Sequence, residues 1–284
     1  NSPIGNNNSA ASPHFGVAAP QDVSRIDVLY GPFAARYAGG SIGATINITT
    51  RMPDHFELYA DALGAVQGFS QYGTDQTNGT WQLGAGVGDR TGGFSWRLSA
   101  NHLDSYAQPL SYVTLTRPAT TSTAGTALTG AFSDLNRTGA AILEIGAGNI
   151  EHQVQDTDTL KLAYDFTNGW QLAYIASLFH QDDNATTQSY LRNASGNTVY
   201  TGSSNINGYN YNIAAGSFSN TIYNWQQSQL AQGLSLTSDK SGDFSWEVIA
   251  SDYAYLNDKQ RVPTTALPAA LGGAAGIRNR LNGT

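Results

Sequence analysis

Beyond residue 53 the chain alternates between apolar and polar residues in seven short segments. In residues 94–101, apolar side chains occupy the even positions and polar side chains the odd ones. Successive side chains of a β-strand point to opposite faces, so a period of two predicts strands with one apolar and one polar face. The segments that follow this pattern are residues 56–66, 81–87, 94–101, 160–166, 170–178, 229–237 and 244–251.

The connections between these segments differ in length in a regular way. Three of them, 88–93, 167–169 and 238–243, are short, contain glycine and are typical of tight hairpin turns. The two intervening ones, roughly 105–159 and 181–226, are long and rich in Thr, Ser, Asn and Gly. Outer-membrane β-barrels combine short periplasmic turns with long extracellular loops. The sequence therefore favours an antiparallel transmembrane β-barrel with strict short–long alternation of its connections.

Aromatic residues recur directly after the short turns. Phe94 and Trp96 open one segment, and Phe244 and Trp246 open another. In a barrel such residues form a belt at the boundary between lipid and water. In a soluble β-sandwich the same residues would pack the core between two sheets, and the aromatic positions alone do not separate the two folds. The sorting of the connections by length favours the barrel.

The composition agrees with strands that have two different faces. Charged residues make up 12% of the 284 residues, which is about half of their share in ordinary soluble domains, yet the mean hydropathy is -0.30. The chain has no cysteine and no run near the ~20 apolar residues that a membrane-spanning helix needs. A net charge of -7 without a basic run argues against nucleic acid as a partner.

No arrangement of residues typical of catalysis or of a cofactor site is present in the sequence. The five histidines are scattered, with no pair at the spacing of metal ligands. Neither a Gly-x-Ser-x-Gly sequence nor a phosphate-binding glycine loop occurs. The sequence therefore predicts a protein that is not an enzyme and that holds no metal ion or cofactor.

Residues 1–53 have a different organisation from the remainder of the chain. Their pattern predicts, in order, a loop to residue 20, a strand at 23–30, a short helix at 32–37, a glycine turn at 39–40 and a strand at 44–50. Motifs follow one another through these elements: Val28-Leu29 before Gly31-Pro32, then the glycine-rich turn, then Ile46-Asn47-Ile48 and Arg51-x-Pro53.

This order and spacing resemble the C-terminal end of the plug domain of TonB-dependent outer-membrane receptors. The resemblance covers about thirty residues, directly before the first strand predicted for the barrel. Tyr30 stands where the family more often has Arg, and Ala44 where it more often has Gly. The residues that carry the resemblance are Arg25, Gly31, Pro32, Gly39, Gly40, Gly43, Asn47, Arg51 and Pro53.

The resemblance implies a fold that is dominated by β-structure and has two parts. Residues 1–53 would form the C-terminal part of an α+β plug domain inside the lumen, and residues 54–284 the N-terminal part of a transmembrane antiparallel barrel. Plugged barrels of this type have about 22 strands, so the seven predicted strands would form only part of one. Because the chain starts without methionine in a polar stretch, we expect it to be a fragment of the receptor.

The resemblance also implies active uptake of a scarce nutrient across the bacterial outer membrane. The expected partners are the TonB–ExbB–ExbD complex, whose contact segment would lie outside this chain, outer-membrane lipid and lipopolysaccharide, and a small-molecule ligand. An iron–siderophore complex is the first candidate ligand, on its frequency in the family, and an oligosaccharide or a vitamin is the alternative. A passive porin, an adhesin barrel and a soluble lectin-like β-domain are the hypotheses from other classes, and the plug motif argues against the first two.

Two groups of residues are candidates for the contacts that this function needs. Polar contacts between plug and barrel are expected between Arg36 and three carboxylates on the polar strand faces, Asp61, Asp165 and Glu247. Ligand contacts are expected from aromatic residues of the second long connection, because aromatic faces among amide groups suit both iron chelates and sugars. These residues are Tyr190, Tyr200, Tyr209, Tyr211, Tyr223 and Trp225.

Overall fold

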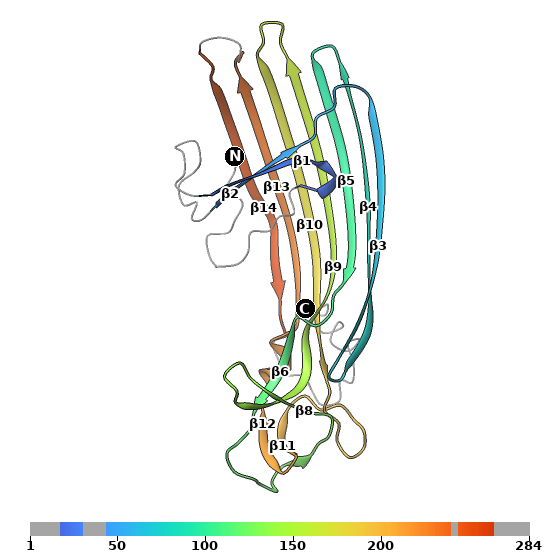
Figure 1. Ribbon diagram of the computed structural model, residues 1–284, viewed down its shortest axis with the longest axis vertical. Helices are drawn as coiled ribbons and strands as arrows, with labels where there is room; N and C mark the ends of the chain where they lie inside the picture. The colour runs from blue at the N-terminus through green and yellow to red at the C-terminus, as the bar shows by residue number, and fades with distance from the viewer. Residues whose placement is uncertain (1–17, 31–43, 240–243, 264–284) are drawn as a thin grey trace.

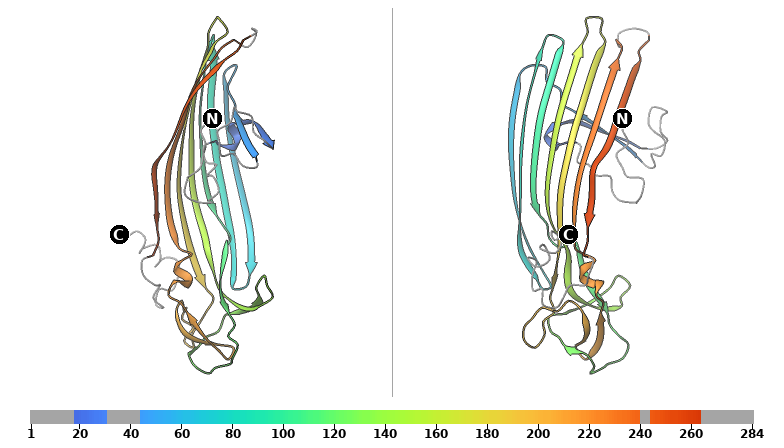
Figure 2. Two further views of the ribbon diagram at one scale, coloured as in Figure 1. Left: turned by 90° about the vertical axis from the view of Figure 1, so that its left-hand side faces the viewer. Right: turned by 180° about the vertical axis from the view of Figure 1, so that it is seen from behind.

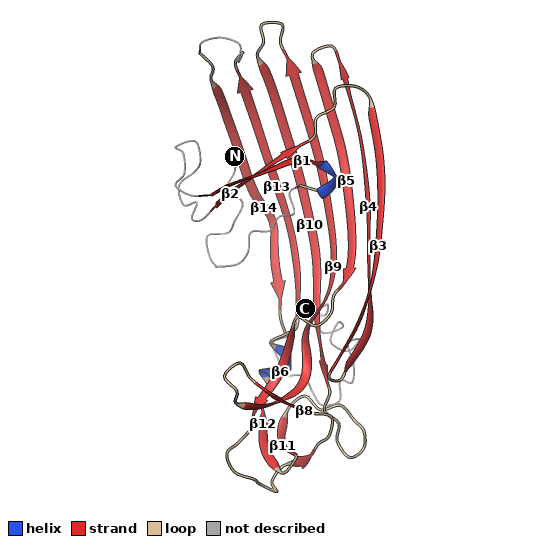
Figure 3. Cartoon of the chain, in the orientation of Figure 1, coloured by secondary structure: helices blue, strands red, loops and turns tan. Residues whose placement is uncertain are grey.

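The computed structural model describes residues 18–30, 44–239 and 244–263. Within them, regular structure is almost entirely β-strand (Figure 3). Outside the described residues lie the predicted helix at 32–37 and six residues singled out above: Gly31, Pro32, Arg36, Gly39, Gly40 and Gly43.

In the described part of the chain, no helix has the length and apolar character needed to cross a membrane.

One large antiparallel sheet forms most of the described structure (Figure 1). Its long strands lie side by side in the order of the sequence, and each is antiparallel to its neighbours. They are β3 (Glu57–Gln71), β4 (Thr74–Thr91), β5 (Phe94–Tyr106), β9 (Ala141–Asp165), β10 (Gln171–Ser189), β13 (Tyr223–Thr237) and β14 (Glu247–Arg261). Each of the seven strands predicted from the alternation is therefore confirmed.

The two faces of this sheet carry different side chains. The register places Leu58, Leu98 and Leu160 in one row across β3, β5 and β9, and all three are exposed. The neighbouring row, on the opposite face, contains Arg97 and Lys161. A shift of the register by one residue would exchange the two faces, so pairing and polarity are fixed together. We call the apolar face the outer face and the polar face the inner face.

The N-terminal segment, which comprises the described residues before residue 54, lies against the inner face. It contains the 3-10 helix η1 (Pro20–Asp22) and the strands β1 (Val23–Tyr30) and β2 (Ala44–Thr50), which pair with each other in a separate antiparallel sheet. Figure 2 shows this small sheet on one side of the large sheet. Both strands have the limits that the sequence pattern predicts.

Several strands of the large sheet are longer than predicted. β9 begins at Ala141 instead of near residue 160, and β10 continues to Ser189 instead of ending near residue 178. Much of the two long connections expected at 105–159 and 181–226 is therefore strand, which corrects the prediction that these regions are loops.

The reason for this difference lies in the polarity of the outer face. Beyond Ala100 the outer face of β5 becomes polar, and His102 contacts Asp156 of β9 with 2.6 Å between Nδ1 and Oδ1. A second pair follows, in which His152 Nε2 and Asp104 Oδ1 are 3.0 Å apart. Where both faces are polar the hydrophobic period of two disappears, although the hydrogen-bonded ladder continues.

The prediction of strict short–long alternation is also wrong at one position. β3 and β4 are joined by a two-residue turn, Tyr72 and Gly73, at the end of the sheet that carries the long connections. Tyr72 has a φ of 51°, in the left-handed region that tight hairpin turns require. Residues 67–80 continue both strands with polar side chains, so the alternation did not indicate this turn.

The ends of the strands farthest from the short turns carry a compact unit, the distal domain, built from the long connections. β6 (Ser111–Thr116) and β8 (Phe132–Leu135) pair with β9. β11 (Gly202–Ile206) pairs with β12 (Tyr209–Ile213) and with β7 (Thr126–Ala127), and α1 (Gly216–Ser219) follows β12. The core of this domain consists of Val113, Leu128, Leu143, Ile145, Leu191, Tyr200, Ile206, Tyr211, Ile213, Phe218 and Ile222.

Paired cysteines can test the register of β5 with β9, since the chain has no cysteine of its own. Ala100 lies directly opposite Asp158, and opposite residues have Cβ atoms about 4.5–5.5 Å apart. We expect Ala100→Cys with Asp158→Cys to form a disulfide under mild oxidation, detected by non-reducing electrophoresis. The offset pair, Ala100→Cys with Leu160→Cys, should stay reduced, and equal yields from the two pairs would contradict the register.

Candidate functional site: the interface between the N-terminal segment and the inner face

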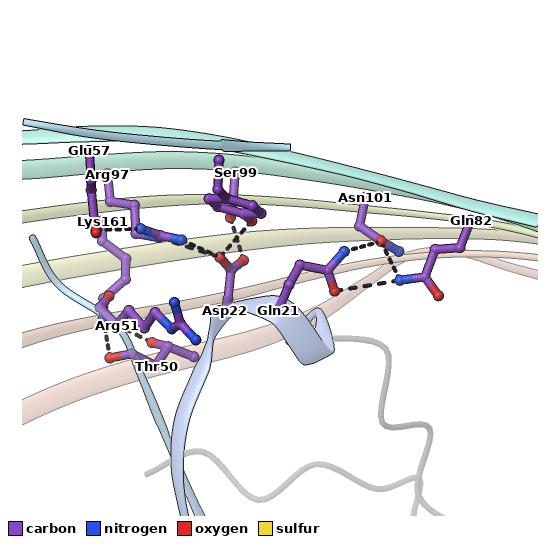
Figure 4. Close-up of polar contacts among 11 residues, drawn as sticks. Gln21, Asp22, Thr50, Arg51, Glu57, Gln82, Arg97, Ser99, Asn101 and Lys161 are labelled. Atoms are coloured by element: carbon purple, nitrogen blue, oxygen red, sulfur yellow. Dashed lines mark hydrogen bonds and ion pairs between the residues drawn. The ribbon is translucent and has the colours of Figure 1, made fainter. Parts of the chain in front are cut away.

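A buried carboxylate of the N-terminal segment is held by side chains of the inner face (Figure 4). Asp22, at the end of η1, is 3% exposed. Its Oδ1 lies 3.0 Å from Nη2 of Arg97 and accepts a hydrogen bond of 3.0 Å from the Tyr59 hydroxyl. Its Oδ2 accepts a hydrogen bond from Ser99, and Arg97 also pairs with Glu57 at 2.7 Å. We call these five residues the Asp22 cluster.

Strand register explains why these side chains meet. Glu57 and Tyr59 of β3, and Arg97 and Ser99 of β5, are successive inner-face residues, and glycines of β4 lie between them. A Cβ atom at Gly86 would lie 2.2 Å from the Tyr59 ring, which crosses β4 at this point. Because Gly86 has no side chain, the Tyr59 side chain can cross β4 and reach Asp22. The centroid of the Tyr59 ring lies 5.0 Å from the Arg97 guanidinium carbon.

A second cation of the inner face holds the end of β2. Lys161 Nζ donates hydrogen bonds to the carbonyl oxygens of Thr50, at 2.9 Å, and of Arg51, at 2.7 Å, and to the Thr50 hydroxyl at 2.8 Å. Backbone carbonyls at the end of a strand lack partners in the ladder, and the ammonium group supplies them. Lys161 thus fixes the point at which the chain leaves the inner face to enter the large sheet.

An amide-lined cavity lies beside the Asp22 cluster. Gln21 donates a hydrogen bond of 2.5 Å to Asn101, which also accepts one of 2.8 Å from Gln82. The adjoining cavity has a volume of about 330 Å³. Four amide side chains, those of Gln82, Asn101, Gln155 and Gln181, line it together with apolar residues that include Leu103 and Phe179. Such amide groups can both donate and accept hydrogen bonds, so this cavity suits an uncharged polar ligand.

A second cavity separates β2 from the strands nearer the β14 edge. Its volume is about 480 Å³, and its lining includes Ile48 and Met52 of the N-terminal segment with Lys161, Ile175 and Glu247 of the inner face. The N-terminal segment therefore contacts the inner face closely over β3, β4 and β5, and less closely over β13 and β14.

The residues predicted to form plug–barrel contacts differ in their surroundings. Arg36 lies outside the described residues. Asp61 lies on the inner face next to Gly84, near the Gln21 side chain. Asp165 pairs at 2.7 Å with Arg90, a residue of the large sheet itself. Glu247 lines the second cavity beside β2.

The predicted charges are reversed in the contacts that the structure does contain. The prediction paired a cation of the N-terminal segment with carboxylates of the strands, whereas Asp22 is the buried carboxylate and Arg97 and Lys161 are the cations. Sequence reasoning missed Asp22 and Arg97 as a pair. The available signal was Arg97 itself, a cation between two serines on the polar side of a segment with a strongly apolar opposite side.

The motif residues that the structure describes have varied roles. Arg25 pairs with Asp27 of the same strand at 2.7 Å on an exposed face. Asn47 lies opposite Asp27 in the β1–β2 ladder. Arg51 contributes its carbonyl oxygen to Lys161, and Pro53 is buried against the position where a Cβ of Gly88 would lie, at 2.8 Å.

The aromatic residues predicted to contact ligand are largely structural. Tyr200 and Tyr211 are 3% and 4% exposed in the core of the distal domain, and Tyr209 packs against that core. Tyr200 and Tyr211 therefore do not present open ring faces, because they supply the apolar core that the long connections need, whereas Tyr209 is half-buried.

The other three predicted aromatic residues are tied to polar partners. The Tyr190 hydroxyl lies 2.7 Å from Oγ1 of Thr74, and Tyr190 is 5% exposed. Tyr223 donates a hydrogen bond to Glu151, and Trp225 donates one of 2.7 Å to Asp258. Their positions are set by contacts within the protein.

In the described part of the chain, no group of three or more His, Asp or Glu side chains has a geometry that could hold a metal ion. Comparisons of the chain with protein-family models, with curated proteins and with solved structures find no match.

Replacing Asp22 tests whether its cluster holds the N-terminal segment. We expect Asp22→Asn to lower the free energy of unfolding by about 3 kcal/mol, because it removes one of the two negative charges that pair with the buried guanidinium of Arg97. It should also speed trypsin cleavage after Arg25 and Arg51 in the folded protein. Unfolding in urea and the rate of cleavage measure the two effects.

A second aspartate of the same segment provides the matched control. Asp27 pairs with Arg25 on an exposed face, where ion pairs contribute little, so Asp27→Asn should leave both measurements unchanged. Equal behaviour of the two variants would mean that the Asp22 cluster does not hold the segment.

Proposed function

We propose that this chain is part of a TonB-dependent receptor of the bacterial outer membrane. In this proposal the large sheet is part of the wall of a transmembrane barrel, and the N-terminal segment is the end of the plug domain. The observation that carries the proposal is the division of the sheet into an apolar outer face and a polar inner face that holds the N-terminal segment. A soluble sandwich buries its apolar face against a second sheet, whereas a membrane barrel presents it to lipid.

The exposure of the outer face supports this assignment. Leu58 is 72% exposed, Leu98 50% and Val248 61%. Soluble monomers rarely expose continuous apolar patches larger than roughly a few hundred Å². Hydrocarbon would cover these side chains without any further protein element.

Aromatic residues at the short-turn end of the sheet support a membrane boundary there. Trp170 and Trp246 contact each other edge to face with ring centroids 5.2 Å apart, and Tyr164 and Phe166 do so at 4.8 Å. Tyr and Trp are enriched where lipid meets water, because their rings are apolar and their polar atoms can reach the headgroups. This end of the sheet is the periplasmic end in the proposal.

The polar pairs His102–Asp156 and His152–Asp104 support the opposite boundary. A transmembrane strand needs about 9–11 residues, and β9 has 25. The part of β9 that faces apolar neighbours on the outer side would cross the lipid, and the remainder would extend into the extracellular space. The distal domain would then lie well outside the membrane.

The edges of the sheet support a larger barrel. Among the described strands, β3 and β14 each pair along only one side within the large sheet. Unpaired backbone groups are not tolerated in hydrocarbon, so the proposal requires further strands that close the sheet from β14 back to β3. Barrels with a plugged lumen have about 22 strands.

In the proposed mechanism, the N-terminal segment closes the lumen at rest and is pulled by the TonB–ExbB–ExbD complex. Movement of the segment along the inner face would separate Asp22 from Arg97 and the end of β2 from Lys161. Both contacts consist of hydrogen bonds and ion pairs, which water can replace as a path opens. A passive porin has no need for such a docked segment, so this interface argues against an open pore.

The ligand is proposed on two different grounds. An iron–siderophore complex remains the first candidate on the resemblance of residues 23–53 to the receptor family. The amide-lined cavity favours an oligosaccharide as the second candidate, because its lining presents neutral groups that match sugar hydroxyls.

Single-tryptophan variants can test which face meets lipid. In full-length protein reconstituted in vesicles with brominated acyl chains, we expect the fluorescence of a variant that retains only Trp170 to be strongly quenched. A variant whose only tryptophan is introduced by Ala173→Trp, on the inner face near the same end of β10, should be quenched little. Equal quenching of the two, or a full-length protein that is monodisperse in water without detergent, would contradict the proposal.

Uptake measurements test the activity and separate the two ligands. Cells that carry the full-length receptor should accumulate its ligand, and deletion of TonB should abolish accumulation, because release of the plug needs the energised complex. Induction by iron starvation would support the siderophore, whereas induction by an oligosaccharide supplied as carbon source would support the sugar. Accumulation that is unchanged without TonB would contradict active uptake.

A further inference from the structure

The tight turn between β3 and β4 brings an aromatic residue to the distal domain. Tyr72 contacts Tyr112 of β6 edge to face, with ring centroids 5.0 Å apart, and Phe132 of β8 at 5.7 Å. Phe132 in turn contacts Tyr190, also at 5.7 Å. Four segments that are far apart in the sequence therefore place aromatic rings together where the β3–β4 turn meets β6 and β8 (Figure 1).

A buried carboxylate lies within this group of rings. Glu144 of β9 is directly opposite Phe132 in the β8–β9 ladder, so the two side chains share one face and are neighbours. Glu144 is 6% exposed, and its Oε2 atom has no hydrogen-bond partner among the described residues. A buried carboxylate oxygen without a donor is costly, so this position is satisfied only when something else supplies a donor.

The surroundings of Glu144 are negative in charge and rich in π-electrons. Burial raises the pKa of Glu144, and the nearby charge of Asp134 raises it further. The pKa of Tyr112 is raised by burial and by the charge of Glu144. Asp134 accepts a hydrogen bond from the Tyr72 hydroxyl. No cation of the described residues pairs with Glu144 or Asp134 in this group.

We propose that Tyr72, Tyr112, Phe132 and Glu144 form a binding site for an organic cation that carries an N–H group, such as a primary alkylammonium ion. The ammonium group donates to the unpartnered Oε2 of Glu144, and its positive charge is stabilised by the ring faces of Tyr72 and Phe132. Phe132 is 37% exposed, so the ligand would reach the buried Oε2 atom by moving this ring aside. The alkyl part packs against the rings.

The donor set favours an organic cation over a metal ion. Calcium takes six to eight oxygen ligands and magnesium six, mostly from carboxylates, carbonyls and water. Here two carboxylates are surrounded by hydrocarbon rings, and the described residues hold no cluster suited to a metal. An alkylammonium ion needs fewer hydrogen bonds and gains from aromatic contact. This inference does not depend on the receptor proposal, because the site is complete within the described residues.

Fluorine NMR of a small probe tests the site directly. We expect 4,4,4-trifluorobutylammonium to bind the purified full-length protein saturably, and 4,4,4-trifluorobutanol, its neutral counterpart, to bind at least about tenfold more weakly. Glu144→Gln preserves the shape of the side chain but removes its charge, and should weaken binding of the ammonium probe by at least about tenfold. Tyr72→Leu should weaken it by about two- to fivefold through loss of the ring face.

Two variants serve as matched controls. Tyr72→Phe keeps the ring and should retain most of the affinity. Asp75→Asn removes one negative charge from the same hairpin at an exposed position, and should leave binding unchanged. Thermal unfolding of each variant confirms that it is folded before its affinity is compared.

Three results would overturn the proposal: no saturable binding to the unmodified protein, equal binding of the ammonium and alcohol probes, or unchanged affinity in Glu144→Gln. In each case Glu144 would be a structural residue that serves packing alone. Because the assay measures binding to purified protein, its failure is separate from any failure of TonB-dependent uptake.

Discussion

The strict alternation of side chains along each strand is the constraint on which the other features depend. Leu98 can face outward only if Arg97 and Ser99 face inward, and the register then places both beside Glu57 and Tyr59 of β3. A slip of one residue would bring Arg97 to the apolar face and Leu98 against Asp22. The apolar outer face and the polar interface with the N-terminal segment are thus two consequences of one pairing, and neither can change without the other.

The Asp22 cluster combines specificity with the possibility of release. Desolvation offsets much of the attraction in a buried ion pair, so the pair adds little net stability, yet removal of one partner alone costs about 3–5 kcal/mol. Arg97 has a second carboxylate, Glu57, which belongs to the large sheet and stays in place if Asp22 leaves. The guanidinium therefore keeps a partner in both situations, and this lowers the energy needed to separate the N-terminal segment from the inner face.

The parts of the structure that sequence reasoning predicted are those with one apolar and one polar side. β5 was evident from residues 94–101, whereas the polar half of β9 was not, because its outer face carries Asp156 and His152 in place of apolar residues. The predicted contact of Arg36 with a strand carboxylate stays a prediction, because Arg36 lies outside the described residues. Which charges meet depends on the register and on the depth of the N-terminal segment along the strands, and Asp165 was already paired with Arg90 across the neighbouring hairpin.

The distal domain shows how the same residue types separate into packing and recognition. Tyr211 lies on a five-residue strand and Tyr200 just before another, too short for alternation to reveal a buried side, and both residues fill the core. Tyr72, in contrast, lies outside this core, because it belongs to the two-residue turn between β3 and β4. A two-residue connection cannot fold back into a core of its own, so it holds the ring against Tyr112 and Phe132 at the surface. The β3–β4 turn, which is short where the alternation predicts a long connection, therefore places an aromatic residue near the unpartnered oxygen of Glu144.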